Sequence, residues 1–139
     1  LEKNAVRHGG GRNHRLNLAD MAMVKDNHIA MAGGITPAVA RVRAAHPGKA
    51  IEVEVKDLGE LEEALGLGVE MVMLDNFTAE QAAAAVARAG GRTRLEISGN
   101  VTLENVAARA ASGVDFISVG ALTHSFRSLD LSLKIVRPA

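Results

Sequence analysis

Short apolar runs recur along the chain, and each ends on a charged, hydroxyl or glycine residue. The most pronounced is Met71 to Phe77 (MVMLDNF), whose apolar part stops abruptly at Asp75 and Asn76. Apolar runs of strand length that alternate with stretches of helical pattern predict repeated βα units. The sequence therefore predicts an α/β fold with about five parallel strands, which we expect within Met21–Val24, Ile51–Val55, Met71–Phe77, Leu95–Ser98 and Phe116–Val119.

The stretches between these runs carry helix signals. Thr78 is followed three residues later by Gln81, which is the pattern of a capping box in front of an alanine-rich helix. A threonine before a first-turn proline is another typical helix start. We expect further helices to begin at Thr36 with Pro37 in the first turn, at Leu58, and at Thr102.

Polar residues follow the predicted strands at the point where each strand ends. The loops after the carboxyl ends of parallel strands line one face of a sheet or barrel, so these residues should converge on one rim. Taken singly, each is explained equally well by the rule that strands end where polarity begins. The collective pattern favours a shared site at that rim, formed by Lys25, Glu54, Asp75, Ser98, Gly99 and Gly120.

The length of the chain bounds the architecture. Its 139 residues suffice for one domain, but a complete eight-unit barrel needs roughly 250 residues. We therefore interpret residues 1–139 as the C-terminal part of a TIM-like α/β-barrel domain, a partial barrel whose first strands are expected upstream.

The composition of the chain argues against some classes of binding partner. Sixteen basic and sixteen acidic residues give a formal charge of zero, and Trp and Tyr are absent, which argues against nucleic-acid binding. No apolar run approaches the roughly 20 residues that span a bilayer. The absence of cysteine excludes disulfides within the chain and is compatible with a reducing compartment, so we expect a cytoplasmic location.

The first fifteen residues suggest an anion site. Ala5 to Arg15 (AVRHGGGRNHR) cluster arginine and histidine side chains around consecutive glycines. Glycine allows close backbone approach to a ligand, and arginine grips a carboxylate or phosphate with two hydrogen bonds. Such a segment suits a small polyanion, although by itself it is more typical of a solvated, flexible entry loop.

Two acids in the second run pose a question of burial. Glu52 and Glu54 alternate with apolar residues, so both carboxylates lie on one face of the strand. Inside a barrel they are costly unless they meet cations, a metal or ligand hydroxyls. On an exposed edge strand they cost nothing, and the sequence leaves both arrangements open.

Glycine-bearing turns mark the last two predicted strand ends. Ser98, Gly99 and Asn100 precede a predicted helix start, and Gly120 ends the fifth strand. Turns of this kind at late strand ends match the phosphate site of α/β barrels. His124 either faces that ligand or is satisfied by the local backbone.

Several motifs together resemble the quinolinate phosphoribosyltransferases, also called carboxylating nicotinate-nucleotide pyrophosphorylases. They occur in order and with compatible spacing along essentially the whole chain, which makes the combination far more specific than its parts. The motifs are NHR at 13–15, KDNHI at 25–29, EVEV at 52–55, MLDNF at 73–77, LEISGNV at 95–101 and GVDFISVGALTHS at 113–125.

The resemblance implies an enzyme. In that family an N-terminal α/β sandwich domain precedes an incompletely closed barrel, and the chains form dimers. The implied reaction joins quinolinate to phosphoribosyl pyrophosphate with Mg²⁺, and it yields nicotinate mononucleotide, pyrophosphate and carbon dioxide for de novo NAD biosynthesis. A chain limited to the barrel portion of this pentosyltransferase is expected to be inactive alone.

The resemblance also implies roles for individual residues. Lys25, Glu54 and Asp75 correspond to catalytic positions, where the two acids hold the ribose hydroxyls and Mg²⁺, directly or indirectly, and stabilise positive charge at the anomeric carbon. Substrate binding is implied for a larger set, with the quinolinate carboxylates on His14, Arg15 and Lys25, and phosphate on Ser98, Gly99, Asn100 and Gly120 beside His124.

The sequence also departs from the family pattern. A Thr-Arg-Lys-Thr motif and a further arginine are expected upstream of Leu1, and Asn100 stands where glycine is common. Asparagine tolerates left-handed backbone better than most residues, so the turn remains plausible. Two other functions stay open: a paralogue of the same fold, such as those linked to molybdenum transport, and a non-catalytic module that binds phosphoribosyl ligands.

Overall fold

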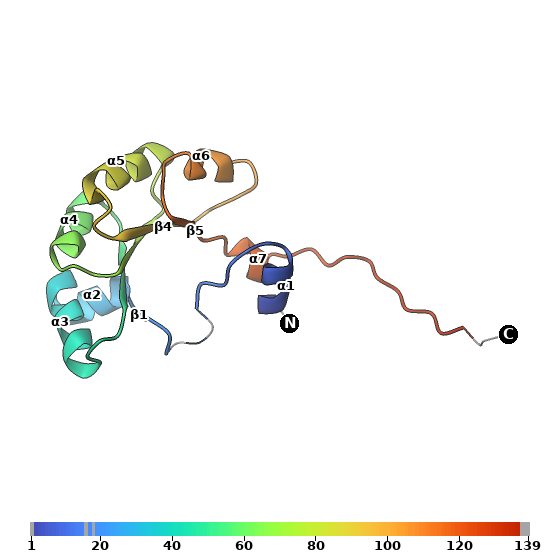
Figure 1. Ribbon diagram of the computed structural model, residues 1–139, viewed down its shortest axis with the longest axis horizontal. Coiled ribbons are helices and arrows are strands. Elements are labelled where there is room, and N and C mark those ends of the chain that lie inside the picture. The colour runs from blue at the N-terminus through green and yellow to red at the C-terminus, as the bar shows by residue number, and fades with distance from the viewer. Residues whose placement is uncertain (1, 16, 18, 137–139) are drawn as a thin grey trace.

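The computed structural model describes residues 2–15, 17 and 19–136, and its centre is one parallel five-stranded sheet (Figure 1). Adjacent strands follow one another in chain order, so each βα unit adds one strand beside the last. The predicted α/β fold is confirmed, with slightly shorter outer strands than expected. The strands are β1 (Ala22–Val24), β2 (Ile51–Val55), β3 (Met71–Asp75), β4 (Arg94–Ser98) and β5 (Phe116–Ile117).

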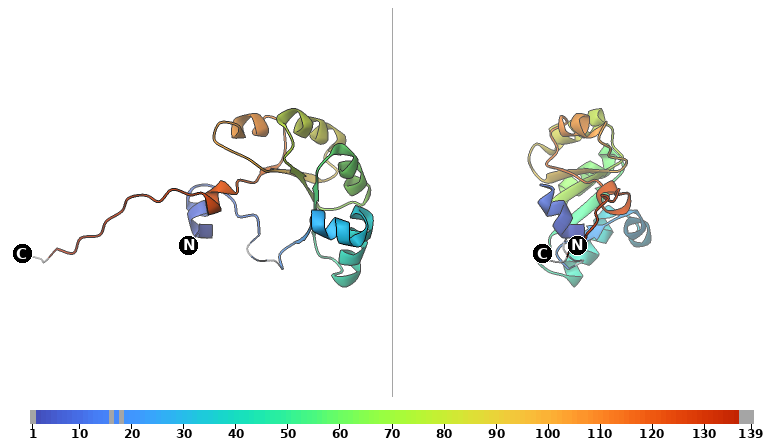
Figure 2. Two further views of the ribbon diagram at one scale, coloured as in Figure 1. Left: turned by 180° about the vertical axis from the view of Figure 1, so that it is seen from behind. Right: turned by 90° about the vertical axis from the view of Figure 1, so that its right-hand side faces the viewer.

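The connecting helices lie along the convex face of this curved sheet (Figures 1 and 2). They are α2 (Asp26–Ala32), α3 (Ile35–Ala45), α4 (Leu58–Gly66), α5 (Ala79–Ala89) and α6 (Val106–Ala110). Two short helices, α1 (Glu2–His8) and α7 (Ala121–His124), lie on the other side. Helices on one face of a parallel sheet are typical of a barrel, whereas a doubly wound fold covers both faces. The expected partial barrel is confirmed.

Capping explains where two of the helices start. The Thr78 Oγ1 accepts a hydrogen bond from the Gln81 N–H at 3.2 Å, and the Gln81 side chain accepts one from the Thr78 N–H at 2.8 Å. The predicted capping box of α5 is therefore confirmed. Asp57 caps α4 by accepting bonds from the N–H groups of Gly59 and Glu60.

Two predicted helix starts are wrong. Gly34, not Thr36, is the N-cap of α3, because the Thr36 hydroxyl and N–H both donate to Glu63 on α4. The helix expected at Thr102 begins only at Val106, because the Thr102 N–H bonds to the Asn105 side chain in an intervening turn. Helices α1 and α2 were not predicted.

Alternation along the strands separates two kinds of surface. On the helix side, buried residues such as Val53, Leu74 and Ile97 join the apolar core. The residues between them, including Glu52 and Glu96, belong to the concave face. Because β2 lies between β1 and β3, its two acids are inside the partial barrel and not on an exposed edge strand. In the described part of the chain, no helix is long and apolar enough to cross a membrane.

Candidate active site

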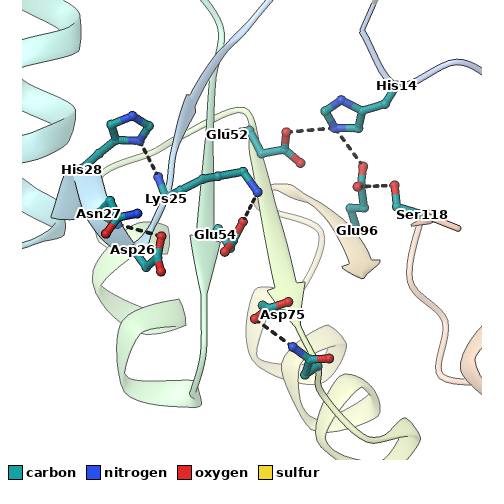
Figure 3. Close-up of polar contacts among 11 residues, drawn as sticks. His14, Lys25, Asp26, Asn27, His28, Glu52, Glu54, Asp75, Glu96 and Ser118 are labelled. Carbon is teal, nitrogen blue, oxygen red and sulfur yellow. Dashed lines mark hydrogen bonds and ion pairs between the residues drawn. The ribbon is translucent and has the colours of Figure 1, made fainter. Parts of the chain in front are cut away.

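A lysine and an acid meet across the carboxyl ends of β1 and β2. The Lys25 Nζ lies 2.6 Å from the Glu54 Oε2, and the carboxylate is much the less exposed partner, at 16% against 45% for the lysine side chain (Figure 3). The Lys25 N–H donates to the His28 Nδ1 at 3.0 Å, which fixes the start of α2 beside the pair. Lys25 and Glu54 therefore share the rim predicted from the sequence.

The next strand end carries Asp75. In the sheet register Asp75 is the partner of Ser98, so the acid adjoins the turn after β4. The Asn76 side chain donates to the Asp75 carboxylate at 2.9 Å, and the Asn76 N–H donates to the Ser98 carbonyl at 2.9 Å. The acid is thereby held next to the predicted phosphate turn.

A hydrogen bond between two asparagines links the ends of β3 and β4. Asn100 donates to the Asn76 Oδ1 at 3.0 Å, and both residues adopt positive φ, at 50° and 56°. The expected left-handed backbone at Asn100 is confirmed. A Cβ at Gly99, whose own φ is 92°, would lie 2.2 Å from the Asn76 Oδ1, so only glycine fits between the two.

The predicted phosphate residues surround one pocket. It has a volume of about 410 Å³, and Ser98, Gly99, Asn100, Gly120 and His124 all line it. The His124 Nδ1 lies 2.9 Å from the Ser125 hydroxyl, while its Nε2 would lie only 2.7 Å from a Cβ at Gly120. His124 thus lines the pocket, and its local partner is the Ser125 side chain and not the backbone that the sequence left as the alternative.

His14 and Arg15 lie at a second pocket, of about 320 Å³. Its lining includes Met71, Arg94 and Phe116, the first residues of β3, β4 and β5. The two predicted quinolinate ligands are therefore placed toward the amino ends of the strands, deeper than the Lys25 and Asp75 rim. Ser118 lines both pockets, so the two adjoin.

The second pocket is rich in cations. Arg12 and Arg94 line it together with Arg15, and the Arg12 guanidinium carbon lies 5.8 Å from the centre of the Phe116 ring. The Arg15 Nη1 donates to the Met21 carbonyl at 3.2 Å, which orients its guanidinium. Several guanidinium groups around one cavity suit a small dicarboxylate or phosphate.

His14 is held by acids that sequence reasoning had not linked to it. Its Nε2 lies 3.0 Å from the Glu52 Oε2 and 3.3 Å from the Glu96 Oε2 (Figure 3). The Ser118 hydroxyl donates to the Glu96 Oε1 at 2.5 Å. No role was predicted for Glu96 or Ser118. The available signal was the acid within the apolar LEIS run, which alternates as the acids of IEVEV do.

Burial dominates the electrostatics of this cluster. Glu52 is 0% exposed, and desolvation, reinforced by the charge of Glu96, raises its pKa to about 7. His14 and Arg15 oppose that shift and lower the pKa less than burial raises it. Although His14 lies within ion-pair distance, neither carboxylate oxygen of Glu52 has a hydrogen-bond partner among the described residues, because distance alone does not supply the alignment that a hydrogen bond needs.

Known proteins are similar to this chain in sequence and in fold. A family model described as "Quinolinate phosphoribosyl transferase, C-terminal domain" matches residues 1–134. A Synechocystis protein named "Probable nicotinate-nucleotide pyrophosphorylase [carboxylating]" is 51% identical over 141 residues, which cover 99% of this chain and 48% of that protein. The Mycobacterium leprae "Nicotinate-nucleotide pyrophosphorylase [carboxylating]" is 49% identical over 138 residues, covering 97% and 49%. The crystal structure of NadC from Streptococcus pyogenes matches with a TM-score of 0.90 and 48% identity, over 96% of this chain and 47% of that one.

The fold and the strand-end residues define a parallel α/β-barrel protein with its candidate site along the concave face. The chain belongs to the family of quinolinate phosphoribosyltransferase C-terminal domains. It spans about half the length of the relatives that it matches. The family resemblance inferred from the motifs is confirmed, while the roles of individual residues remain predictions.

Proposed function

We propose that this chain forms the barrel part of an enzyme that transfers a phosphoribosyl group to quinolinate with loss of carbon dioxide. The supporting observation is the convergence of the Lys25–Glu54 pair, Asp75 and the glycine-bearing pocket on one edge of the sheet. The sequence similarity supports it too, because this chain is 51% identical to a protein named "Probable nicotinate-nucleotide pyrophosphorylase [carboxylating]". The products are nicotinate mononucleotide, pyrophosphate and carbon dioxide, in NAD biosynthesis.

The chemistry needs fixed negative charge beside the ribose. The quinolinate nitrogen forms a bond to the anomeric carbon while the bond to pyrophosphate breaks and its electron pair leaves with pyrophosphate. Positive charge develops on the ribosyl carbon, and the carboxylates of Glu54 and Asp75 stabilise it electrostatically. In the decarboxylation that follows, the electron pair of the broken bond passes to the cationic pyridinium ring, and a proton then takes the place of the carboxylate.

The two pockets divide the substrates between them. The pocket around Ser98, Gly99, Asn100 and Gly120 offers backbone amides to the ribose phosphate, with His124 beside it. The cation-rich pocket around His14 and Arg15 offers partners to the two carboxylates of quinolinate. Lys25 contributes a third cation from the rim. Its ammonium group has three donors and the bond to Glu54 uses one, so it can also donate to a quinolinate carboxylate.

The acid pair also fits Mg²⁺. The bond from Lys25 uses the Oε2 of Glu54, and the bond from Asn76 uses the Oδ2 of Asp75, so each carboxylate keeps a second oxygen for a cation or a bound water. Mg²⁺ usually takes one or two carboxylates and completes its shell with waters and substrate phosphates. When bound, it neutralises charge on the pyrophosphate leaving group.

Assembly and location are part of the proposal. Six large apolar residues between 126 and 136 are at least 66% exposed, which supports at least a dimer of the full-length enzyme (Phe126, Leu129, Leu131, Leu133, Ile135, Val136). The absence of cysteine is consistent with a cytoplasmic location.

The deciding experiment is isothermal titration of the full-length protein, first with quinolinate and then with phosphoribosyl pyrophosphate and Mg²⁺, followed by an assay for nicotinate mononucleotide. Binding of both substrates with product formation supports the proposal. Binding of the phosphoribosyl donor without quinolinate points to a paralogue with another acceptor, and binding without turnover points to a non-catalytic module.

A further inference from the structure

Glu52 is a buried acid whose needs the described residues do not meet. Its side chain is 0% exposed, and among the described residues neither carboxylate oxygen has a well-aligned hydrogen-bond partner, although the His14 Nε2 lies 3.0 Å from the Oε2. A buried carboxylate in that state is costly, and proteins ordinarily pair such a group with a cation or a metal. The proposed roles of Glu54 and Asp75 leave Glu52 unused, although it lies on the same strand as Glu54.

The surroundings of Glu52 have the geometry of a cation site. One ligand atom each from His14, Glu52 and Glu96 lies within 4.8 Å of the others. The two closest separations are 3.0 and 3.3 Å. In a tetrahedral site with metal–ligand bonds of about 2.0 Å, neighbouring ligand atoms stand roughly 3.3 Å apart. The two separations from His14 match that spacing, and the two carboxylates lie within 4.8 Å of each other.

We propose that His14 through its Nε2, together with Glu52 and Glu96, forms a second cation site, distinct from the Glu54 and Asp75 acids, while the His14 Nδ1 stays available to quinolinate. Its ligand is a compact cation, supplied either by a first-row divalent metal ion such as Zn²⁺ or Mn²⁺ or by a lysine or arginine side chain from polypeptide outside the described residues. Imidazole together with two carboxylates suits either source, because it provides two negative charges around one small space.

Two further contacts support this assignment. The Ser118 hydroxyl donates to the Glu96 Oε1 and leaves the Oε2 directed toward His14, as outer partners orient metal or cation ligands. The pocket of about 320 Å³ that His14, Glu96 and Ser118 line gives a cation a route to the cluster. Arg15 lines the same pocket, but its Nη1 donates to the Met21 carbonyl.

The test compares thermal stability among three glutamine variants of the full-length protein. Glu52→Gln keeps the size of the side chain and removes its charge. Glu54→Gln is a positive control, because it breaks a partly buried pair that is occupied by Lys25. Glu62→Gln is a negative control, because its pair with Arg88 at 3.7 Å is half exposed on both sides. Metal content is measured alongside, together with calorimetric titration of the chelated protein with ZnCl₂ and MnCl₂.

A filled site predicts that Glu52→Gln lowers Tm by about 5 °C or more, while Glu62→Gln leaves it within about 1 °C. If the cation is a metal, chelation abolishes or reverses the difference between Glu52→Gln and the parent, and Glu52→Gln and Glu96→Gln each weaken metal binding at least tenfold. If it is a basic side chain, the difference survives chelation. A Glu52→Gln variant as stable as its parent or more so, with no metal affected by Glu52 or Glu96, overturns the proposal.

These outcomes are independent of turnover. Failure of the nicotinate mononucleotide assay removes the proposed function and leaves the stability comparison standing. Failure of the stability comparison removes the second cation site and leaves the catalytic proposal intact.

Discussion

The middle of the sheet and its two ends are built differently. Helices α3, α4 and α5 each bury three residues, whereas α1, α2, α6 and α7 bury none. Glu54 and Asp75 are carried by the well-packed middle. His14, Gly120 and His124 belong to the sparsely packed ends, so the proposed chemistry lies on well-packed structure, while much of the proposed ligand binding depends on sparsely packed segments.

We expect the largest effect when the two ends of the sheet are left uncovered. We predict that the 139-residue chain expressed alone associates and makes no nicotinate mononucleotide. Its outer strands β1 and β5 each have one sheet neighbour, and apolar side chains such as Leu133 and Ile135 are more than 90% exposed. Size-exclusion chromatography with far-UV circular dichroism and a product assay are the measurements. A monodisperse monomer with a sharp melt, or product above background, contradicts this prediction.

Substitution in the middle should affect chemistry more than binding. We expect Glu54→Gln and Asp75→Asn in the full-length enzyme to lower kcat by about 10²-fold or more, because fixed charge matters most when the ribosyl cation forms. Quinolinate affinity should change far less. Steady-state kinetics with calorimetry tests this, and unchanged kcat at saturation with weakened quinolinate binding would reverse the assignment.

Glu52, a residue of the middle that contacts His14 of the N-terminal segment, should make the stability of the protein depend on pH. Its pKa is raised from 4.5 to about 7, so the folded chain binds more protons than the unfolded chain between these values. The stability due to this group is therefore complete below pH 4.5 and is lost as pH rises through 7, by about 3 kcal/mol. Urea unfolding of the chelated full-length protein from pH 4 to 8 should show this decline in the parent and not in Glu52→Gln. Parallel curves of the two chelated proteins contradict it, and a cation site filled by added metal should suppress it.

Lys25 follows the outer strand β1 and pairs with Glu54 at the end of β2, and its substitution should have the smallest effect. We predict that Lys25→Ala in the full-length enzyme weakens quinolinate binding by about 1–3 kcal/mol, because one charge-assisted contact is removed. Calorimetric titration with quinolinate measures the change. An unaltered affinity together with unaltered turnover would exclude Lys25 from the site.

The same contrast explains how far the sequence could be interpreted. The strands of the middle have apolar residues at successive or at alternate positions, which is a local pattern, and the capping box at Thr78 depends only on residues three apart. Both were predicted. Thr36 misled because its hydroxyl is used by Glu63, a residue 27 positions away that no local pattern reveals.

The candidate site divides in the same way. Strand-end residues such as Asp75 and Ser98 could be placed together from parallel topology alone. The contact of His14 with Glu52 and Glu96 could not, because the segment before β1 has no periodic pattern that fixes its path across the concave face. Glu96 was visible as an acid in an apolar strand, but its partner was not.

The hydrogen bond between Asn76 and Asn100 fixes the separation between the ends of β3 and β4. In the proposed enzyme, Asp75 addresses the ribose and the turn at Gly99 addresses a phosphate, and covalent bonds fix the distance between these two parts of the donor. The asparagine bond, with the tight approach of Gly99 to Asn76, fixes the matching distance on the protein. In a mutational library Gly99 should therefore accept almost no replacement, because any side chain at this position would displace Asn76 and change that distance.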